Sequence, residues 1–407
     1  MENKGSSRFN IHKEGLMPQE EMLEVGNKHK ALKIGIPSEN HEVESRVPLT
    51  PEAVEILTGH GHEVWLETGA GKAANYLDTD YSERGGIICE QRKEVFATSD
   101  VLLKISPPTP EEIGWMKERQ VLLSSFQVFT HCKEKYIRSL MQKKVTAIAF
   151  EKIQDEHDCY PAVRSMSAIA GTTSMLIAAE YLSNQRGGKG VMLGGVTGIT
   201  PTEVVILGAG TVAEYAVRAA YGVGSEVKVF DHSIHRLRRL QSSVGMMVPT
   251  SIFHPKVILK ALRSADVVIG AIRRGDRQED YFITEEMVKE MKKGSVIIDV
   301  SIDRGGSIET SELRTQVDPV FVKHGVIHYC VPNIASRVAR TASIAISNVF
   351  APLIMGLGGI GSTGRHLKDN VGLRHGVYIY NGTLTNENVG QRLGIPSKDI
   401  NLLMAAF

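Results

Sequence analysis

Short apolar runs alternate with amphipathic segments along the first part of the chain. Five such runs are brief and rich in β-branched residues, at positions 32–37, 63–67, 100–105, 120–125 and 145–151. Runs of this length and composition predict buried strands. Between the first two, "TPEAVEILTGHGH" offers Thr50 as a helix cap, Pro51 at the first helical position and apolar residues at helical spacing. This alternation predicts a parallel sheet covered by helices on both faces.

A second alternation begins after a long apolar helical stretch at 165–182 and a glycine-rich loop, "GGKGVMLGGVTGITP". Its predicted strands lie at 203–208, 226–231, 266–271, 295–300 and 326–331. Another helical stretch, "TASIAISNVFAPLIMGL", follows them. The tail from Gly364 to Phe407 is too short for a third domain, so we expect it to pack back on the first. The pattern predicts an α/β protein with two Rossmann-like, doubly wound domains and a discontinuous first domain.

Bulk composition narrows the class of protein. The 407 residues are 42% hydrophobic, which is enough for two domains with cores, and 47 basic against 46 acidic residues leave a net charge of +1. That balance gives no case for nucleic acid or a membrane as a partner. The four cysteines lack CxxC spacing and predict reduced thiols without a metal site: Cys89, Cys132, Cys159 and Cys330. With no signal-peptide core and no uninterrupted apolar window of membrane length, we expect a cytoplasmic protein.

The segment "VVILGAGTVAEYAVRAA" (204–220) follows a predicted strand and opens a predicted helix. In that context Gly208 permits a tight turn, and Gly210 lets backbone N–H groups approach a pyrophosphate at the helix N-terminus. Ala213 is small enough for the close helix–strand packing that a third glycine would give. Asp231 ends the next strand, 21 residues after Gly210. A carboxylate there binds ribose hydroxyls and repels a 2′-phosphate, so the motif predicts NAD as the cofactor.

A second match to the same spacing, Gly356-Leu-Gly358-Gly-Ile-Gly361, lacks this context. It follows a helical pattern, and the next predicted strand, "GVYIYN", ends in Asn381 with no acid. We interpret this segment as a flexible loop. The two alternations define the domains, and the first motif assigns NAD to the second of them. We predict a polar N-terminal extension at 1–30, a substrate domain at 31–162 plus 341–407, and an NAD-binding domain at 163–340.

Five stretches together resemble the alanine dehydrogenase family, which also includes the NAD-binding subunit of nicotinamide nucleotide transhydrogenase. They are "GIPSENHEVESRVPLTPEAVEIL", "GGKGVMLGGVTGI", "VVILGAGTVAEYAVRAA", "SVIIDVSIDRGGSIET" and "HYCVPNIASRVARTAS". The likeness runs from Leu32 to Gly394. It implies two α/β domains flanking a cleft and the reversible, NAD-dependent deamination of L-alanine to pyruvate and ammonium. It also implies a homo-oligomer, a hexamer as in alanine dehydrogenases or a dimer as in the transhydrogenase subunit.

The resemblance also implies roles for individual residues. Arg46 matches the arginine that binds the substrate carboxylate, a task that suits a bidentate guanidinium. Asp303 matches the acid that lies beside the nicotinamide and assists proton transfer. Asn333 and Ser167 match positions that contact the nicotinamide portion, and Arg236 matches a basic residue beside the adenosine ribose. Arg46 is alternatively a surface arginine at a helix start, and the last three are alternatively structural.

Two departures from the family pattern affect the expected catalysis. The catalytic lysine of the family, in a "KVKEP"-like stretch, corresponds to Ser106 in "LLKISPP", and the catalytic histidine corresponds to Gln127 in "LLSSFQ". The lysine that remains, Lys104, is expected on the opposite face of its strand. Serine and glutamine cannot titrate at neutral pH, although both can hydrogen-bond a substrate oxygen. About two extra residues after Gln127 would let His131 turn into the gap, although a solvent-facing histidine is the simpler interpretation.

Three functions therefore stay open. The first is an NAD-dependent amino-acid dehydrogenase close to alanine dehydrogenase, in which Arg46 binds the substrate and Asp303 acts with a substitute base. The second is an NAD(H)-binding family member without deaminase activity, serving as a sensor or partner protein, which Ser106 and Gln127 favour. The third is an NAD oxidoreductase for a different 2-oxo or hydroxy acid, with serine and glutamine as neutral carbonyl ligands. All three bind a small molecule and need no metal.

Overall fold

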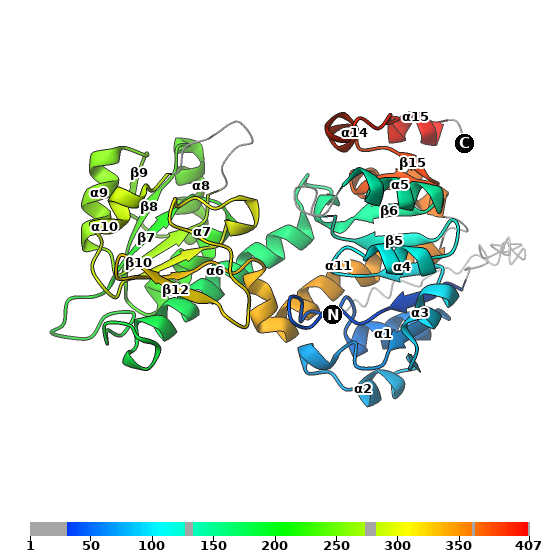
Figure 1. The fold of residues 1–407 in the computed structure, drawn as a ribbon, viewed down its shortest axis with the longest axis horizontal. Coiled ribbons are helices and arrows are strands. Elements are labelled where there is room, and N and C mark those ends of the chain that lie inside the picture. The colour runs from blue at the N-terminus through cyan, green and yellow to red at the C-terminus, as the bar shows by residue number, and fades with distance from the viewer. Residues whose placement is uncertain (1–30, 127–132, 273–281, 360–362, 406–407) are drawn as a thin grey trace, which may run out of the picture.

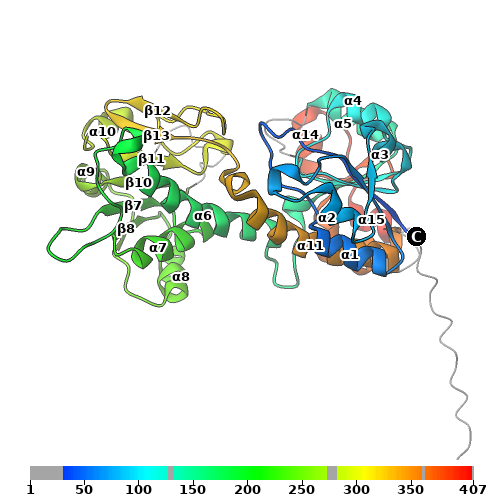
Figure 2. The same ribbon diagram turned by 90° about the horizontal axis from the view of Figure 1, so that it is seen from below.

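The computed structural model describes residues 31–126, 133–272, 282–359 and 363–405. They form two α/β halves, each built on one sheet, that lie side by side and are joined by two long helices (Figures 1 and 2). These helices are α6 (Pro161–Leu182) and α11 (Ala339–Gly359), which pack against each other. The predicted fold class, two doubly wound α/β domains, is confirmed.

The first half is an eight-stranded sheet in the order β15-β14-β6-β5-β4-β1-β2-β3. Its strands are β1 (Lys33–Ile36), β2 (Glu63–Glu67), β3 (Ile87–Cys89), β4 (Val101–Leu103), β5 (Val121–Ser124), β6 (Thr146–Ala149), β14 (Val377–Tyr380) and β15 (Thr383–Leu384). Its further helices are α1 (Pro51–Gly59), α2 (Asp78–Ser82), α3 (Arg92–Thr98), α4 (Pro110–Trp115), α5 (Glu134–Gln142), α12 (Thr363–Asp369), α13 (Val371–Arg374), α14 (Glu387–Leu393) and α15 (Ile400–Ala405). Because β14 pairs with β6, the C-terminal segment completes this half, and the first domain is discontinuous as predicted.

The second half is a seven-stranded sheet in the order β12-β13-β11-β10-β7-β8-β9. Its strands are β7 (Glu203–Leu207), β8 (Glu226–Phe230), β9 (Thr250–Ser251), β10 (Val267–Gly270), β11 (Val296–Asp299), β12 (Val320–Lys323) and β13 (Val326–Tyr329). Its further helices are α7 (Thr211–Gly222), α8 (Ile234–Val244), α9 (Pro255–Ser264) and α10 (Glu285–Lys289). Short 3₁₀ turns occur in both halves and between them: η1 (Lys72–Ala74), η2 (Phe150–Lys152), η3 (Asn184–Arg186), η4 (Ile302–Arg304) and η5 (Ile334–Val338).

The strand order fixes where each half can bind a ligand. Strands β3-β2-β1-β4-β5-β6 and β9-β8-β7-β10-β11-β13 both follow the order 3-2-1-4-5-6 and are parallel throughout. In such sheets the ligand crevice lies at the carboxyl ends of the strands, where the order reverses. The reversals fall between β1 and β4 and between β7 and β10. The predicted strands are thus parallel, and three further strands, β12, β14 and β15, are added to the edges of the two sheets in antiparallel pairs.

Each sheet carries apolar side chains on both faces, as the continuous apolar runs predict. In β4, Val101 and Leu103 belong to one buried cluster and Leu102 to the cluster on the other face. Thr50 caps α1 by accepting the N–H of Ala53 at 3.4 Å, which confirms the predicted helix start. Burial of both faces of the sheet, together with local helix capping, accounts for the three layers of the first half.

One helical stretch among the described residues, Ile334–Gly358, is long and apolar enough by composition to cross a membrane. Half of its most apolar window is buried inside the protein. Ile346, Phe350 and Ile354 on this helix belong to the core of the first half. Such burial is typical of the core helix of a water-soluble protein.

The expectation of a flexible loop at the second glycine motif is wrong for Gly356 and Gly358, which lie inside α11. Gly361 falls outside the described residues. A Cβ on Gly356 would lie 2.3 Å from Cε1 of His366, and a Cβ on Gly358 would lie 2.4 Å from Cε1 of His62. The helix therefore needs glycine because imidazole rings pack directly against its backbone.

Candidate active site

The glycine turn after β7 has the geometry of a pyrophosphate cradle. Gly208 has φ +104°, and a Cβ there would lie 2.5 Å from the carbonyl oxygen of Ala271, so only glycine fits. Gly210 caps α7, yet a Cβ on it would meet nothing within 4 Å. Among the described residues, the space beside Gly210 at the start of this 12-residue helix is therefore open. Backbone donors and a helix N-terminus facing open space suit a diphosphate.

Asp231 is fixed beside this turn at the carboxyl end of β8. Its Oδ2 accepts the N–H of Ala209 at 2.8 Å, and its Oδ1 accepts the N–H of Ser233 at 2.8 Å. The side chain is buried, and each oxygen keeps a further lone pair. A buried carboxylate held by two amides next to the glycine turn is placed as a ribose ligand would be.

Two other predicted cofactor contacts lie on helices. Arg236 is exposed in the first turn of α8 and donates its N–H to Oγ of Ser233 at 3.3 Å. This places it close in sequence and space to Asp231. Ser167 is half-buried on α6 and follows Met166. Met166 in turn lies with its Sδ 3.2 Å from Nη1 of Arg46.

The side chain of Arg46 is buried and joined to the second half through Glu44. Nε of Arg46 donates to Oε1 of Glu44 at 2.7 Å, and Nη2 donates to Oε2 at 2.5 Å. Asn333, in the left-handed conformation with φ 61° just before η5, donates from Nδ2 to Oε2 of Glu44 at 2.7 Å. The structure therefore brings the predicted substrate ligand and a predicted nicotinamide contact to one carboxylate.

Asp303 is exposed on the short turn η4, after the carboxyl end of β11. This loop is organised by Asp299, which is completely buried and accepts bonds from Ser301, Ser307 and Ser311. Burial raises the pKa of Asp299, while these four hydrogen bonds oppose the shift. Asp299 thus fixes the shape of the loop that presents Asp303 at the carboxyl edge of the sheet.

Lys104 and Ser106 follow β4 at the switch point of the first sheet. Lys104 is 3% exposed, and its Nζ lies 3.4 Å from Oε2 of Glu39 and 3.3 Å from Oε1 of Glu112. Burial raises the pKa of Glu39, against the opposing charge of Lys104. Strand alternation is the wrong reason to separate Lys104 from Ser106, because residues two apart share a face. The strand ends at Leu103, and ion pairing is what holds Lys104 inside the protein.

Ser106 is half-buried, and its main chain is held on both sides. Its N–H donates to Oε1 of Glu39 at 3.4 Å, and its carbonyl accepts the hydroxyl of Ser124 at 2.9 Å. Gln127 and His131, the other residues proposed near the reacting atoms, lie outside the described residues. The last described residue before them, Phe126, donates its N–H to Oε1 of Glu151 at 2.8 Å.

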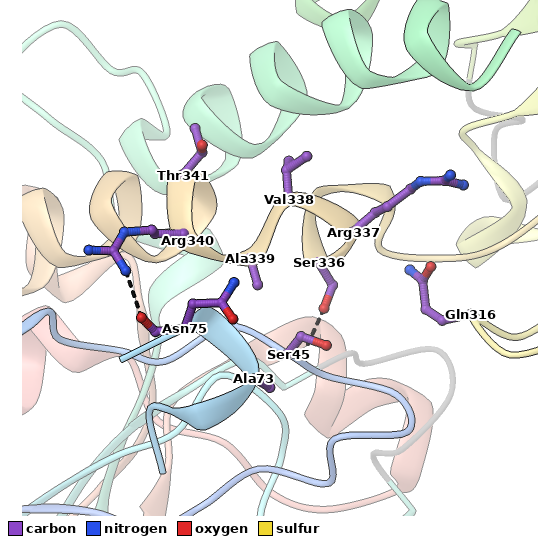
Figure 3. Close-up of a pocket in the computed structure, with 10 residues that line it drawn as sticks. All are labelled: Ser45, Ala73, Asn75, Gln316, Ser336, Arg337, Val338, Ala339, Arg340 and Thr341. Carbon is purple, nitrogen blue, oxygen red and sulfur yellow. Dashed lines mark hydrogen bonds between the residues drawn. The ribbon is translucent and has the colours of Figure 1, made fainter. Parts of the chain in front are cut away.

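A pocket of about 310 Å³ lies where the two halves meet (Figure 3). Ser45 and Asn75 line it from the first half, Gln316 from the second, and Arg337 and Arg340 from the connecting segment η5–α11. Nη1 of Arg340 donates to the carbonyl oxygen of Asn75 at 2.6 Å across this junction. The predicted site residues do not line the pocket themselves, although Ser45 is the neighbour of Arg46.

Sequence reasoning missed three buried acids that organise the site: Glu39, Glu44 and Asp299. Each holds loop amides or a cation at the carboxyl edge of a sheet. A signal was available for Asp299, which ends the apolar run "VIID", where a charge costs free energy unless it is paired. Glu39 and Glu44 lie in the polar stretch "SENHEVESR", which carries no such signal. No group of three or more His, Cys, Asp or Glu residues among those described could hold a metal ion.

Two sheets of strand order 3-2-1-4-5-6, a glycine turn with a ribose-placed acid, and an interdomain arginine define a two-domain dinucleotide-binding oxidoreductase fold. Residues 35–170 match the family "Alanine dehydrogenase/PNT, N-terminal domain", and residues 174–387 match "Alanine dehydrogenase/PNT, C-terminal domain". The chain belongs to this family. The predicted family, the NAD-dependent dehydrogenase class and NAD as the cofactor are thereby confirmed.

Similar proteins cover almost the whole chain. An alanine dehydrogenase from Methanococcus maripaludis is 38% identical over 364 residues, 89% of this chain and 97% of its own length. An alanine dehydrogenase from Bacillus subtilis is 37% identical over 89% of this chain and 94% of its own. A solved L-alanine dehydrogenase superposes with a TM-score of 0.82 at 33% identity, covering 88% of this chain and 98% of that one. A transhydrogenase from Sinorhizobium meliloti, with a TM-score of 0.73 at 21% identity, shares the fold.

Proposed function

We propose that this protein is an NAD-dependent oxidoreductase that interconverts a small 2-amino acid and its 2-oxo acid, with alanine and pyruvate as the first candidate pair. The observation that carries the proposal is the chain of contacts from Arg46 through Glu44 to Asn333. It links a group suited to a carboxylate to the half of the molecule that holds the glycine turn. Relatives named alanine dehydrogenase support the same reaction.

Each predicted residue has a task in this reaction. Arg46 binds the substrate carboxylate and orients the carbon that loses or gains hydride. Asn333 and Ser167 contact the nicotinamide end of the nucleotide. Asp231 binds the adenosine ribose. NAD, when bound, supplies the hydride acceptor.

Arg236 lies beside the adenosine ribose, near Asp231, where a cation contributes to holding the nucleotide. Asp303 stands at the carboxyl edge of the second sheet and assists the movement of a proton at the reacting nitrogen or oxygen. With Ser106 and Gln127 in the places of the family's lysine and histidine, Asp303 is the titrating group that the proposed site retains among the residues described. Oxidation of an amine needs proton transfer at two steps, so we expect slow deamination.

A second candidate, favoured by the buried ion pairs of Lys104, is a protein that binds NAD(H) but does not deaminate. Lys104 is held between Glu39 and Glu112, so it is not available to replace the missing lysine. Ser106 provides a hydroxyl, which can bind a carbonyl oxygen but cannot accept a proton near neutral pH. The same neutral side chains, Ser106 and Gln127, also support a third candidate, an oxidoreductase that acts on a different 2-oxo acid.

One assay separates these candidates. NADH oxidation is followed spectrophotometrically with a panel of 2-oxo acids, each with and without ammonium. Turnover that requires ammonium identifies an amino-acid dehydrogenase, and turnover without ammonium identifies a hydroxy-acid oxidoreductase. NADH binding with no turnover for any acid identifies the non-enzymatic candidate. Failure to bind NADH at all contradicts the whole proposal.

We also propose that the protein is a cytoplasmic homo-oligomer, a hexamer or a dimer, as the resemblance implies. The proposal follows from family membership. Light scattering after size exclusion measures the mass of the assembly directly, and a mass equal to the 44.6 kDa of one chain contradicts it.

A further inference from the structure

The carboxylate of Glu44 has more hydrogen-bond donors around it than an ordinary ion pair supplies. It accepts three bonds from Arg46, from the backbone N at 3.0 Å, Nε at 2.7 Å and Nη2 at 2.5 Å. It also accepts Nδ2 of Asn333 at 2.7 Å and Oγ of Ser336 at 3.2 Å. Glu44 is 3% exposed. A buried carboxylate with five donors from three residues is a rigid junction, because moving any partner leaves the charge unsatisfied.

The main chain on both sides of Arg46 is fixed to the connecting segment by two serines. The N–H of Ser45 donates to Oγ of Ser336 at 2.8 Å, a bond visible in Figure 3. The N–H of Val47 donates to Oγ of Ser343 at 2.9 Å. Ser336 and Ser343 are both buried. The backbone of Arg46 is therefore anchored to η5 and α11, the elements that lead from the second half into the first.

These contacts occupy one edge of the guanidinium, and no carboxylate of the described residues pairs with the other edge. Nε and one N–H of Nη2 face Glu44, whereas Nη1 and the second N–H of Nη2 form the opposite edge. Nη1 contacts Sδ of Met166 at 3.2 Å, and a thioether is only a weak acceptor. A planar guanidinium can hold two carboxylates in this way, one on each edge.

We propose that Glu44 is a positioning residue, which holds one edge of the Arg46 guanidinium, ties it to Asn333, and so aims the opposite edge at the substrate carboxylate. The proposal rests on the proposed function, because it assumes that Arg46 binds a 2-oxo or 2-amino acid. Two possible roles of Glu44 predict opposite changes in substrate affinity when its carboxylate is removed. If Glu44 only neutralises Arg46, its removal strengthens the attraction of the cation for a second carboxylate. If it positions Arg46, removal releases the side chain and weakens substrate binding.

The test compares Glu44→Gln, which keeps the shape, and Glu44→Asp, which keeps the charge but shortens the reach. Kinetics with NADH, ammonium and pyruvate should show KM for pyruvate at least about tenfold higher in both, since charge-assisted hydrogen bonds are lost. The NADH dissociation constant should change much less than KM, because the glycine turn and Asp231 are untouched and Asn333 is the one proposed cofactor contact that Glu44 holds. Ser347→Ala is the matched control. Ser347 lies on α11, as Ser343 does, and its hydroxyl accepts the N–H of Thr50 at 3.1 Å. Because it does not contact Arg46, KM of this variant should match that of the parent.

A double variant shows whether Glu44 acts through Arg46. Once Arg46→Lys is present, adding Glu44→Gln should raise KM little further, because the guanidinium that Glu44 positions is gone. A lower or unchanged KM for Glu44→Gln overturns the proposal, as do fully additive effects. Melting temperatures of all variants identify a purely structural effect, in which stability falls while KM stays constant. If Glu44→Gln does not fold, Glu44→Asp carries the same comparison.

Failure of the proposed function is recognised separately. The dissociation constant of pyruvate is measured from the fluorescence of NADH bound to the parent and to each variant. Parent protein that binds pyruvate without turnover contradicts the proposed reaction, and the role of Glu44 is then judged from these constants. Equal constants in the parent and in Glu44→Gln contradict the positioning role while leaving the reaction intact. Parent protein that binds neither pyruvate nor any other 2-oxo acid contradicts both.

Discussion

The amide of Ala209 donates a hydrogen bond to Oδ2 of Asp231 across 2.8 Å, joining the glycine turn after β7 to the tip of β8. The same carboxylate accepts the N–H of Ser233 through Oδ1. Its position relative to the turn is therefore fixed by the main chain before any nucleotide arrives. A ribose binding here meets a preorganised acceptor and avoids the cost of ordering a side chain.

This geometry predicts a strong preference for NADH over NADPH. A 2′-phosphate beside the buried Asp231 meets a negative charge held in place by two amides, so NADH should bind at least about tenfold more tightly. Asp231→Ala should remove most of that preference, as measured by fluorescence titration of both nucleotides. Asp266→Asn is a control, because that buried acid lies at the amino end of β10 and pairs with Lys189 and Lys292. Equal affinities in the parent would rule the assignment out.

Replacing Arg46 should separate substrate binding from cofactor binding. Arg46→Lys keeps the charge but cannot hold Glu44 and a substrate on two edges, so kcat/KM for the 2-oxo acid should fall at least about tenfold. The NADH dissociation constant should stay within about twofold. Arg46→Ala should abolish turnover, and it should also destabilise the protein by about 3–5 kcal/mol, because Glu44 is left buried without its cation.

A stable Arg46 variant that loses NADH and substrate together would show that Arg46 serves the cofactor. Urea unfolding of each variant distinguishes this outcome from simple unfolding. Arg92→Lys tests the effect of an arginine substitution elsewhere, since Arg92 pairs with Glu67 and Glu112 in the same half. Its kcat/KM should remain close to that of the parent.

The burial of His328 predicts how the stability of the protein changes with pH. It is fully buried, with Nδ1 2.9 Å from the carbonyl oxygen of Val326 and Nε2 2.8 Å from Oγ1 of Thr310. Burial lowers the pKa of His328 to about 4, helped by the positive charges of Lys323 and His324. The unfolded chain therefore binds the proton more readily than the native state. The neutral His328 therefore contributes its full share to the free energy of unfolding above about pH 6.5, and this share is lost as the pH falls towards 4.

His328→Gln should remove this dependence. By linkage the parent should lose about 2–3 kcal/mol of unfolding free energy between pH 7 and pH 4.5 through this residue, and the variant should lose correspondingly less. Urea titrations at a series of pH values measure the difference. Identical pH slopes for the two proteins would show that His328 is protonated equally in the native and unfolded states.

The sequence predicted the elements whose pattern is local, and it failed where distant residues decide. The apolar runs at β1, β4, β7 and β11 are continuous because those strands are covered on both faces, so their positions were readable. The glycine turn was readable because strand, turn and helix are contiguous. The helix through Gly356 and Gly358 was not, because the reason for glycine at these positions, the packing of His366 and His62 against them, comes from other elements.

The same limit applies to the candidate site. Arg46 and Asp303 were identified from motifs, and their roles stay predictions. In the structure Asp303 follows β11 at the carboxyl edge of its sheet, and Arg46 is joined through Glu44 to Asn333. Glu44 was missed, although it is two residues from Arg46, because its role depends on Asn333, which lies 289 positions away in the chain. The role of a buried acid depends on its hydrogen-bond partners, and the folded structure is needed to show which residues those are.

The last prediction concerns Ser106 and Gln127. Ser106 and Gln127 are neutral side chains in the places of the family's lysine and histidine. Deamination of alanine should therefore be weak, because neither of them can exchange a proton with the substrate opposite Asp303. Restoring the pair with Ser106→Lys and Gln127→His should raise pyruvate amination by up to about 10²–10⁴-fold, the usual contribution of a positioned acid or base. The gain should be far from additive, because the two groups act on one proton transfer.

The measurement compares initial rates of the parent, both single variants and the double variant with pyruvate, ammonium and NADH. Lys104→Met serves as a second comparison. Lys104 is buried between Glu39 and Glu112, so its loss should lower stability without specifically lowering kcat. A parent that already turns over at about 10 s⁻¹ or more would contradict the prediction, since that is an ordinary enzyme rate. His131→Ala belongs in the same series, because a loss of rate there would identify His131 as the base that replaces the missing histidine.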